Sequence, residues 1–64
     1  MFMRGFILDT PGKLAAARHN QQEVEVYKVG QYLHSGTISE IAEEAVYING
    51  GLYLKDLHVF KIRK

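Results

Sequence analysis

Hydrophobic and polar residues alternate over much of this chain, and such alternation is typical of half-buried β-strands. The clearest example is EVEVYKVG, residues 23–30, where Val24 and Val26 alternate with charged residues and a tyrosine. The segment QYLHSG, residues 31–36, follows as a short extended piece, and we expect it to end in a turn at Ser35–Gly36. Both segments therefore predict β-structure in the middle of the chain.

The strongest local signal is a hairpin centred on Asn49–Gly50–Gly51. An Asn-Gly pair accepts the positive φ angles of a tight hairpin turn at little cost. After the hairpin the alternation shifts phase, and we expect a bulge or bend near Lys55–Asp56 to account for the shift. Alternating apolar residues flank the turn on both sides: Val46, Ile48, Leu52 and Leu54.

Two segments near the amino terminus have less regular patterns. Met3–Leu8 is largely apolar and ends at a turn signal in residues 9–12, so we expect a first strand there. In the next segment, Lys13–Asn20, three consecutive alanines favour a helix, and Pro11 suits a first helical turn. The apolar stripe of this segment is poor, however, and the choice between helix and strand stays open on these grounds.

The segment GTISEIAEEAVYINGG, residues 36–51, is compatible with two structures. A helix beginning at Ser39 would span about two turns, which is marginal unless packing supports it. Alternatively, strands Thr37–Ile41 and Ala45–Asn49 would flank a turn at Ala42–Glu44. The firm β signals on both sides favour strand–turn–strand. In that arrangement we expect four residues of the segment to be buried: Ile38, Ile41, Val46 and Ile48.

Length and composition limit the fold to one small domain. A chain of 64 residues buries only about 60% of its unfolded surface, so its stability margin is small. The absence of cysteine excludes disulfides and cysteine-based metal sites. We predict a single all-β domain spanning residues 1–64, with an ordered core of about residues 3–60. The expected architecture is a small sandwich or partly open barrel of about six short antiparallel strands.

Charge and hydropathy restrict the functional classes. Basic and acidic residues nearly balance, with a net charge of +1, and their signs are interspersed, whereas nucleic-acid modules usually carry a basic stripe. The basic end KIRK, residues 61–64, is typical of a solvated tail. No apolar run approaches the roughly 18 residues of a membrane span. We therefore expect no nucleic-acid partner, and membrane attachment only through an anchor that is not in this chain.

Residues with catalytic or ligand chemistry form no recognisable motif. His34–Ser35 with a distant Asp56 has the residue types of a triad, but it lacks a strained nucleophile turn. Glu43–Glu44 point apart if they are neighbours on a strand or turn, and no glycine-rich phosphate loop is present. We predict no catalytic, cofactor or metal site, and hence no enzyme. The histidines are too poorly spaced for metal ligation: His19, His34 and His58.

The order of glycines and strand signals over residues 3–60 has a counterpart in a known family. Five patterns follow one another along the chain. They are a Tyr-x-Val-Gly segment, a Gly-apolar-x-x-Ile segment, an acidic turn, a Val-x-Ile segment and a glycine hairpin. The residues that form them, in order, are Tyr27, Val29, Gly30, Gly36, Ile38, Ile41, Glu43–Glu44, Val46, Ile48 and Gly50–Gly51. This order resembles the homology-region domain of the type II secretion inner-membrane component C and the related PilP-like pilus proteins. The resemblance implies that Lys13–Asn20 is a strand despite its helical propensity.

The same resemblance implies a function. It predicts a protein–protein interaction module that links the inner-membrane platform to an outer-membrane secretin in type II secretion or type IV pili. The partner would be the amino-terminal periplasmic domain of the secretin, at the periplasmic face of the inner membrane. If the chain is complete as given, a cytoplasmic location is expected. The alternative is a stand-alone cytosolic SH3-like module of phage or plasmid type that binds nucleic acid or protein.

The candidate docking edge is the first predicted strand, Met3–Leu8. A strand that is terminal in sequence and carries few charges leaves an edge open to a partner, and Gly5 allows close backbone approach. The alternative is that Phe6 and Leu8 fill the core and that Gly5 relieves crowding. The predicted partner-binding residues are Met3, Arg4, Gly5, Phe6 and Ile7.

Overall fold

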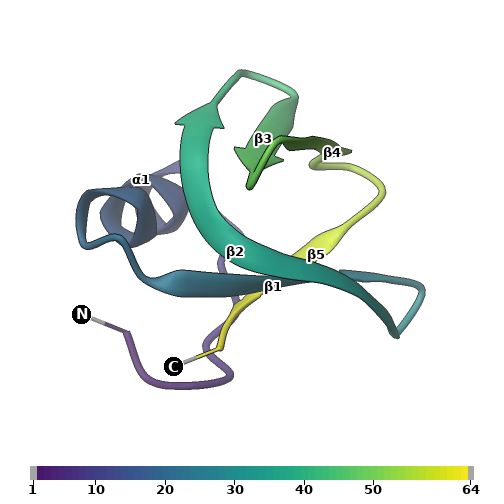
Figure 1. Ribbon diagram of the computed structural model, residues 1–64, viewed down its shortest axis with the longest axis horizontal. Coiled ribbons are helices and arrows are strands. Elements are labelled where there is room, and N and C mark those ends of the chain that lie inside the picture. Colours follow the sequence, from purple (N-terminus) through teal and green to yellow (C-terminus); the bar gives the residue numbers. More distant parts are fainter. Residues whose placement is uncertain (1, 64) are drawn as a thin grey trace.

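One antiparallel sheet, curved around a small core, makes up most of the molecule (Figure 1). The computed structural model describes residues 2–63. The all-β class with short antiparallel strands is confirmed. Within residues 2–63 one helix and five strands follow one another: α1 (Pro11–His19), β1 (Glu23–Lys28), β2 (Gln31–Ile41), β3 (Ala45–Ile48), β4 (Gly51–Leu54) and β5 (Val59–Ile62).

Strand β2 is the element that bends the sheet. The strand order is β4-β3-β2-β1-β5, so β2 pairs with β1 in its first half and with β3 in its second half. Figure 1 shows its long curved path between the two halves. The register shifts at Val26–Tyr27 and again between Ile38 and Glu40. Such irregularities increase the bend and twist of a strand.

Gly36 lies inside β2, so the turn predicted at Ser35–Gly36 is wrong. A Cβ atom at residue 36 would lie 2.8 Å from the Cβ of Asn49 and 3.3 Å from the Cγ2 of Ile48. The β3–β4 hairpin can therefore approach β2 here only because residue 36 has no side chain. A glycine within a strand can mark such a close approach rather than a turn.

The segment 36–51 forms two strands joined by a turn, as predicted. Strand β2 ends at Ile41, and β3 begins at Ala45. Ile41 lies at the end of its strand and is only partly buried, which differs from the prediction. The other three residues expected in the core are buried: Ile38, Val46 and Ile48.

Both tight hairpins close through residues at positive φ. Asn49 and Gly50, with φ of 49° and 85°, join β3 to β4 and confirm the predicted Asn-Gly turn. Val29 and Gly30, with φ of 51° and 75°, join β1 to β2. A β-branched residue rarely adopts positive φ. For this reason the sequence indicates the second hairpin much less clearly than the first.

Residues 11–19 form helix α1, so the strand implied by the family resemblance is wrong and the propensity is right. The Thr10 side chain caps the helix by accepting a hydrogen bond from the Lys13 N–H at 3.2 Å, and Pro11 opens the first turn. Only Leu14 and Ala17 are buried, one helical turn apart, and that spacing does not suit a strand. In residues 2–63 no helix is long and apolar enough to cross a membrane.

The segment before α1 is not the regular strand predicted over Met3–Leu8. Its residues 5–8 run antiparallel to β5 but form only an isolated bridge, between Ile7 and Lys61. Arg4 and Gly5 lie in a turn, and Gly5 has a φ of 83°. Because this φ interrupts an extended chain, the segment follows β5 without becoming a full strand.

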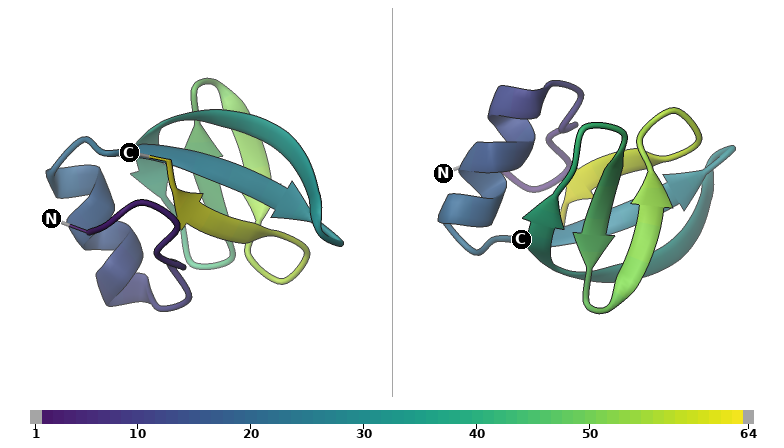
Figure 2. Two further views of the ribbon diagram at one scale, coloured as in Figure 1. Left: turned by 90° about the horizontal axis from the view of Figure 1, so that it is seen from below. Right: turned by 90° about the horizontal axis from the view of Figure 1, so that it is seen from above.

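The core fills the inside of the curved sheet, and α1 packs at one end of it (Figure 2). Buried Gln22 holds the amino-terminal segment to the start of β1. Its side chain accepts a hydrogen bond from the Phe2 N–H at 3.1 Å and donates one to the Phe2 C=O at 2.9 Å. The buried apolar cluster comprises Leu8, Leu14, Ala17, Val24, Val26, Ile38, Val46, Ile48, Phe60 and Ile62.

Candidate binding surfaces

Strand β4 is an outer strand of the sheet, and its exposed side chains are apolar. Leu52 and Leu54 are 53% and 43% exposed, and Leu57 in the following turn is also exposed. The strand contains no charged residue and no proline, which are the usual means of blocking an edge. Figure 2 shows β4 beside β3, and no other strand of residues 2–63 pairs with its far side.

Hydrogen bonds to β3 determine which backbone groups of β4 face outward. The Lys55 N–H donates to the Glu44 C=O at 2.8 Å, so the backbone of residue 55 faces β3. Backbone groups alternate in direction along an antiparallel strand. Residues 51 and 53 therefore also face β3, whereas Leu52 and Leu54 direct their N–H and C=O groups away from it.

One of these outward groups is already used inside the molecule. The Leu54 C=O accepts hydrogen bonds from the Leu57 N–H at 3.2 Å and from Nδ1 of His58 at 2.8 Å. The remaining outward groups are the Leu52 N–H, the Leu52 C=O and the Leu54 N–H. Together with the two leucine side chains, these groups form a short exposed edge, which we call the β4 edge.

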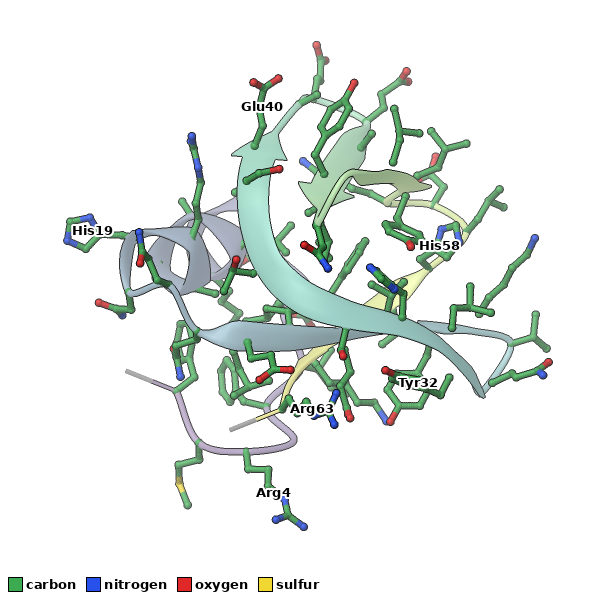
Figure 3. The ribbon with its side chains drawn as sticks, viewed as in Figure 1. Arg4, His19, Tyr32, Glu40, His58 and Arg63 are labelled. Carbon is green, nitrogen blue, oxygen red and sulfur yellow. The ribbon has the colours of Figure 1, made fainter. Side chains whose placement is uncertain are left out.

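The predicted partner-binding residues lie together on the surface beside β5. Met3 is 82% exposed, and Figure 3 shows Arg4 pointing away from the molecule. The Phe6 ring stacks on Phe2 with centroids 4.5 Å apart, and the Lys13 ammonium lies 5.2 Å from its centroid. Some backbone N–H and C=O groups of this segment form hydrogen bonds with β5. Partner binding by Met3, Arg4, Gly5, Phe6 and Ile7 stays a prediction.

A small apolar groove lies between this segment and the turn after β4. Its volume is about 200 Å³, below the roughly 300–1,000 Å³ of a typical small-molecule site. His58, labelled in Figure 3, lies on one wall. The size suits a partner side chain better than a cofactor. The apolar lining residues are Ile7, Leu8, Pro11, Leu14, Val59 and Phe60.

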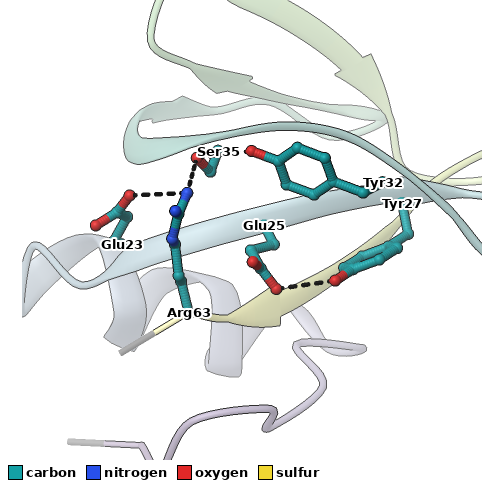
Figure 4. Close-up of polar contacts among 6 residues, drawn as sticks. All are labelled: Glu23, Glu25, Tyr27, Tyr32, Ser35 and Arg63. Atoms are coloured by element: carbon teal, nitrogen blue, oxygen red, sulfur yellow. Dashed lines mark hydrogen bonds and ion pairs between the residues drawn. The ribbon is translucent and has the colours of Figure 1, made fainter.

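The outer face of β1, β2 and the end of the chain carries a polar network (Figure 4). The guanidinium of Arg63 lies 3.4 Å from the Glu23 carboxylate and donates a hydrogen bond to Oγ of Ser35 at 2.5 Å. The Tyr32 hydroxyl also donates to that oxygen, at 3.0 Å. Arg63 is therefore engaged by neighbours within the fold.

Tyr27 and Glu25 form a second polar pair on the same face. The Tyr27 hydroxyl donates to the Glu25 carboxylate at 3.0 Å, and this bond, which requires the protonated phenol, raises the pKa of Tyr27 above its usual value. The Lys61 ammonium lies 4.6 Å from the Tyr27 ring centroid. A hollow of about 450 Å³ beside these groups is lined by three basic side chains, those of Arg4, Lys61 and Arg63, and by the carboxylate of Glu25.

The residues with catalytic potential are not assembled into a triad. Ser35 faces the outer surface and contacts Arg63, whereas the neighbouring His34 stacks on Tyr53 with ring centroids 6.0 Å apart. Asp56 lies in the exposed turn after β4. Within residues 2–63 no group of three or more His, Asp or Glu side chains is placed to hold a metal ion. Absence of catalysis stays a prediction.

Comparison of the chain with protein-family models, curated proteins and solved structures finds no match. Sequence reasoning placed the docking edge at Met3–Leu8 and overlooked β4. The sequence signal for an exposed apolar strand was GLYL, residues 51–54. Both sets of alternate positions in it lack charged residues, so neither face of the strand is marked as the solvent side.

Proposed function

We propose that this protein is a non-catalytic protein-interaction module that docks a partner at the β4 edge. The observation that carries the proposal is the unpaired Leu52 backbone, flanked by the exposed side chains of Leu52 and Leu54. An uncharged edge with free donors and acceptors is a template for a further strand. Natural proteins usually blunt such edges, and this one is left open.

The docking mode is addition of an extended partner segment to the sheet. Main-chain hydrogen bonds to Leu52 and Leu54 would set the register, and apolar partner residues would cover the two leucine side chains. Leu57 extends the apolar surface beyond the end of β4. The partner's extended segment is therefore expected to be apolar on the face that it shares with these leucines.

The partner that we propose is the amino-terminal periplasmic domain of an outer-membrane secretin, at the periplasmic face of the inner membrane. This partner is supported by the resemblance in the order of glycines and strand signals, of which the Asn49–Gly50 hairpin and the strand–turn–strand of residues 36–51 occur in the fold. Helix α1, in place of the strand that the resemblance implies, is a departure from it.

Calorimetric titration with a purified secretin amino-terminal domain tests the proposal. Leu52→Pro removes an outward N–H and leaves the β3–β4 ladder intact, because proline is tolerated where an edge N–H faces solvent. We expect affinity to fall at least about tenfold, or roughly 1.4 kcal/mol. The matched variant Leu52→Thr keeps the N–H and should lose less.

A third variant separates the two candidate surfaces. Arg4→Glu alters the predicted amino-terminal segment and should leave secretin-domain affinity unchanged. If Arg4→Glu weakens binding and Leu52→Pro does not, the interface lies at Met3–Ile7 and the β4 proposal is wrong. If the wild-type protein does not bind the domain at all, the proposed partner is wrong.

A further inference from the structure

We infer that the β4 edge is self-complementary and that a second copy of this chain occupies it when no other partner does. The inference rests on the proposed function, because it uses the same outward groups of Leu52 and Leu54. In the resulting dimer two β4 strands pair antiparallel across a two-fold axis. The two curved sheets then join into one continuous sheet.

The free backbone groups select one register for this pairing. An antiparallel pair places outward-facing residues opposite each other, and a residue that meets its own copy exchanges both of its hydrogen bonds. Leu52 has its N–H and C=O free, so it can face the partner's Leu52 with both bonds made. In the same register Leu54 lies opposite the partner's Gly50, whose φ of 85° takes it out of the strand, so the pairing rests on the two Leu52 bonds.

The neighbouring symmetric register is less favourable. Sliding one strand by two residues along the other would pair Leu52 with the partner's Leu54. This pairing would require the Leu54 C=O as an acceptor. That oxygen already accepts hydrogen bonds from the Leu57 N–H and from Nδ1 of His58. The shifted register would also set Tyr53 opposite the partner's Tyr53. The structure therefore favours the register centred on Leu52.

Side-chain packing supports the same register. Gly51 lies under the ring of Tyr53, whose hydroxyl oxygen stands 2.8 Å from the position that a Cβ of residue 51 would occupy. In the proposed pairing Tyr53 lies opposite the partner's Gly51, which has no side chain to meet the ring. An aromatic residue opposite a glycine is a known way to stabilise strand pairs that include glycine.

Charge does not oppose the pairing. Any charged side chain at a two-fold axis meets its own copy, and like charges opposite each other destabilise a strand pair. Residues 49–54 are uncharged, and the first charged residue after β4, Lys55, lies opposite the partner's Asn49. An edge this short buries less surface than a stable interface, so the dimer is expected to be weak and reversible.

Sedimentation velocity across micromolar to millimolar protein, without any partner, tests self-association. We expect the mass to rise from monomer towards dimer, and we expect Leu52→Pro to raise the dimer dissociation constant at least about tenfold, or 1.4 kcal/mol. Leu52→Thr should raise it less. The inference would be overturned if the wild-type protein stayed monomeric at millimolar concentration. It would also be overturned if the Leu52→Pro variant, shown by its melting curve to be folded, dimerised as well as the wild type.

Nuclear magnetic resonance of wild-type dimer, mixed from isotope-labelled and unlabelled copies, tests the register without any mutation. In the proposed register the Tyr53 and partner Gly51 backbones form a non-hydrogen-bonded pair, with Cα atoms about 4.5 Å apart. We expect an intermolecular contact between their Hα protons. Contact between the two Tyr53 Hα protons instead would contradict the register.

The two proposals fail separately. Monomeric protein that still binds the secretin domain in a Leu52-dependent manner removes the dimer and keeps the proposed function. A Leu52-dependent dimer that binds no secretin domain keeps the dimer and removes that partner. If both hold, addition of the secretin domain should dissociate the dimer, because the two occupants compete for the same groups.

Discussion

The two edges of this sheet differ in how they are covered. At β5, the Leu8 N–H donates to the Phe60 C=O at 2.8 Å, and the Ile62 N–H donates to the Phe6 C=O at 2.9 Å. The amino-terminal segment thus satisfies backbone groups on the outer side of β5. At β4 no strand of residues 2–63 pairs with the outer side, and the Leu52 N–H, the Leu52 C=O and the Leu54 N–H are left unpaired.

The comparison shows that the edge strand with a charged residue is the covered one, and that the uncharged edge strand is open. The covered strand β5 carries Lys61 on its exposed side, whereas β4 is uncharged and open. If protection from association were the main requirement, charge would be more useful on the open edge. The distribution is the reverse of what an isolated, non-binding domain needs, which is why we propose β4 as the contact surface.

The largest expected difference between the edges is in amide hydrogen exchange. The Leu8 and Ile62 amides are hydrogen-bonded between the segment and β5, whereas those of Leu52 and Leu54 face outward. At a dilution that keeps the protein monomeric, the first pair should exchange about 10³-fold more slowly, since their exchange requires openings that cost several kcal/mol. Equal exchange in the two pairs, measured by magnetic resonance, would mean that the β5 edge is not covered.

Side-chain truncation should distinguish the edges next most strongly. Leu8, on the covered side, is buried, and Leu8→Ala should reduce the free energy of unfolding by about 2–5 kcal/mol. Leu52→Ala, on the open side, should change it by no more than about 0.5 kcal/mol. Urea denaturation of both variants measures the contrast. A similar loss in both would show that Leu52 is buried in the free protein.

The joint between the two halves of the sheet can be tested at Gly36. Gly36→Ala places a Cβ against Asn49 and Ile48 and should destabilise the fold by about 1–3 kcal/mol, as overpacking does. Gly12→Ala is the matched control. It lies in α1 with open space around the new methyl group, and it should be neutral or stabilising by up to about 1 kcal/mol. Thermal melting that ranks the two variants in the opposite order would refute the close approach.

The smallest expected effect lies just before α1, on the covered side. The Asp9 carboxylate lies 2.8 Å from the Lys13 ammonium, whose hydrogen bond and charge lower the pKa of Asp9. A lowered pKa in the folded state adds stability above the unfolded value of 3.8, and this contribution is lost as the pH falls through the folded pKa. Asp9→Asn should therefore lower the melting temperature slightly at pH 7, and the difference should shrink as the pH falls below 3.8. Because the pair is exposed, high salt should reduce the difference.

Local sequence patterns predicted the parts of the fold that depend on nearby residues. The Asn49–Gly50 turn needs only its two residues to accept positive φ, and the alternation in residues 23–28 already identifies β1. Strand–turn–strand over residues 36–51 followed from the same pattern. Helix α1 was also available from propensity and from Pro11, and it was misassigned only where the family resemblance was followed instead.

Features that depend on distant residues were not predictable in the same way. Gly36 resembles a turn glycine in the sequence, and only the approach of Asn49, thirteen positions later in the chain, shows that it lies inside a strand. Met3–Leu8 resembles a free edge strand, but β5 bonds its residues 5–8. Both errors have one cause, which is that a neighbour from another part of the chain decides the role of the residue.

The sequence by itself therefore determined the all-β class, the tight hairpin and the strand–turn–strand, because turn chemistry and the alternation of apolar residues act over a few neighbouring positions. Only the tertiary structure decided that β4 is the open edge and β5 the covered one. The sequence GLYL shows two leucines at alternate positions but not whether another strand covers them. That outcome depends on the strand order β4-β3-β2-β1-β5, which is set by long-range pairing around a common core rather than by any local pattern.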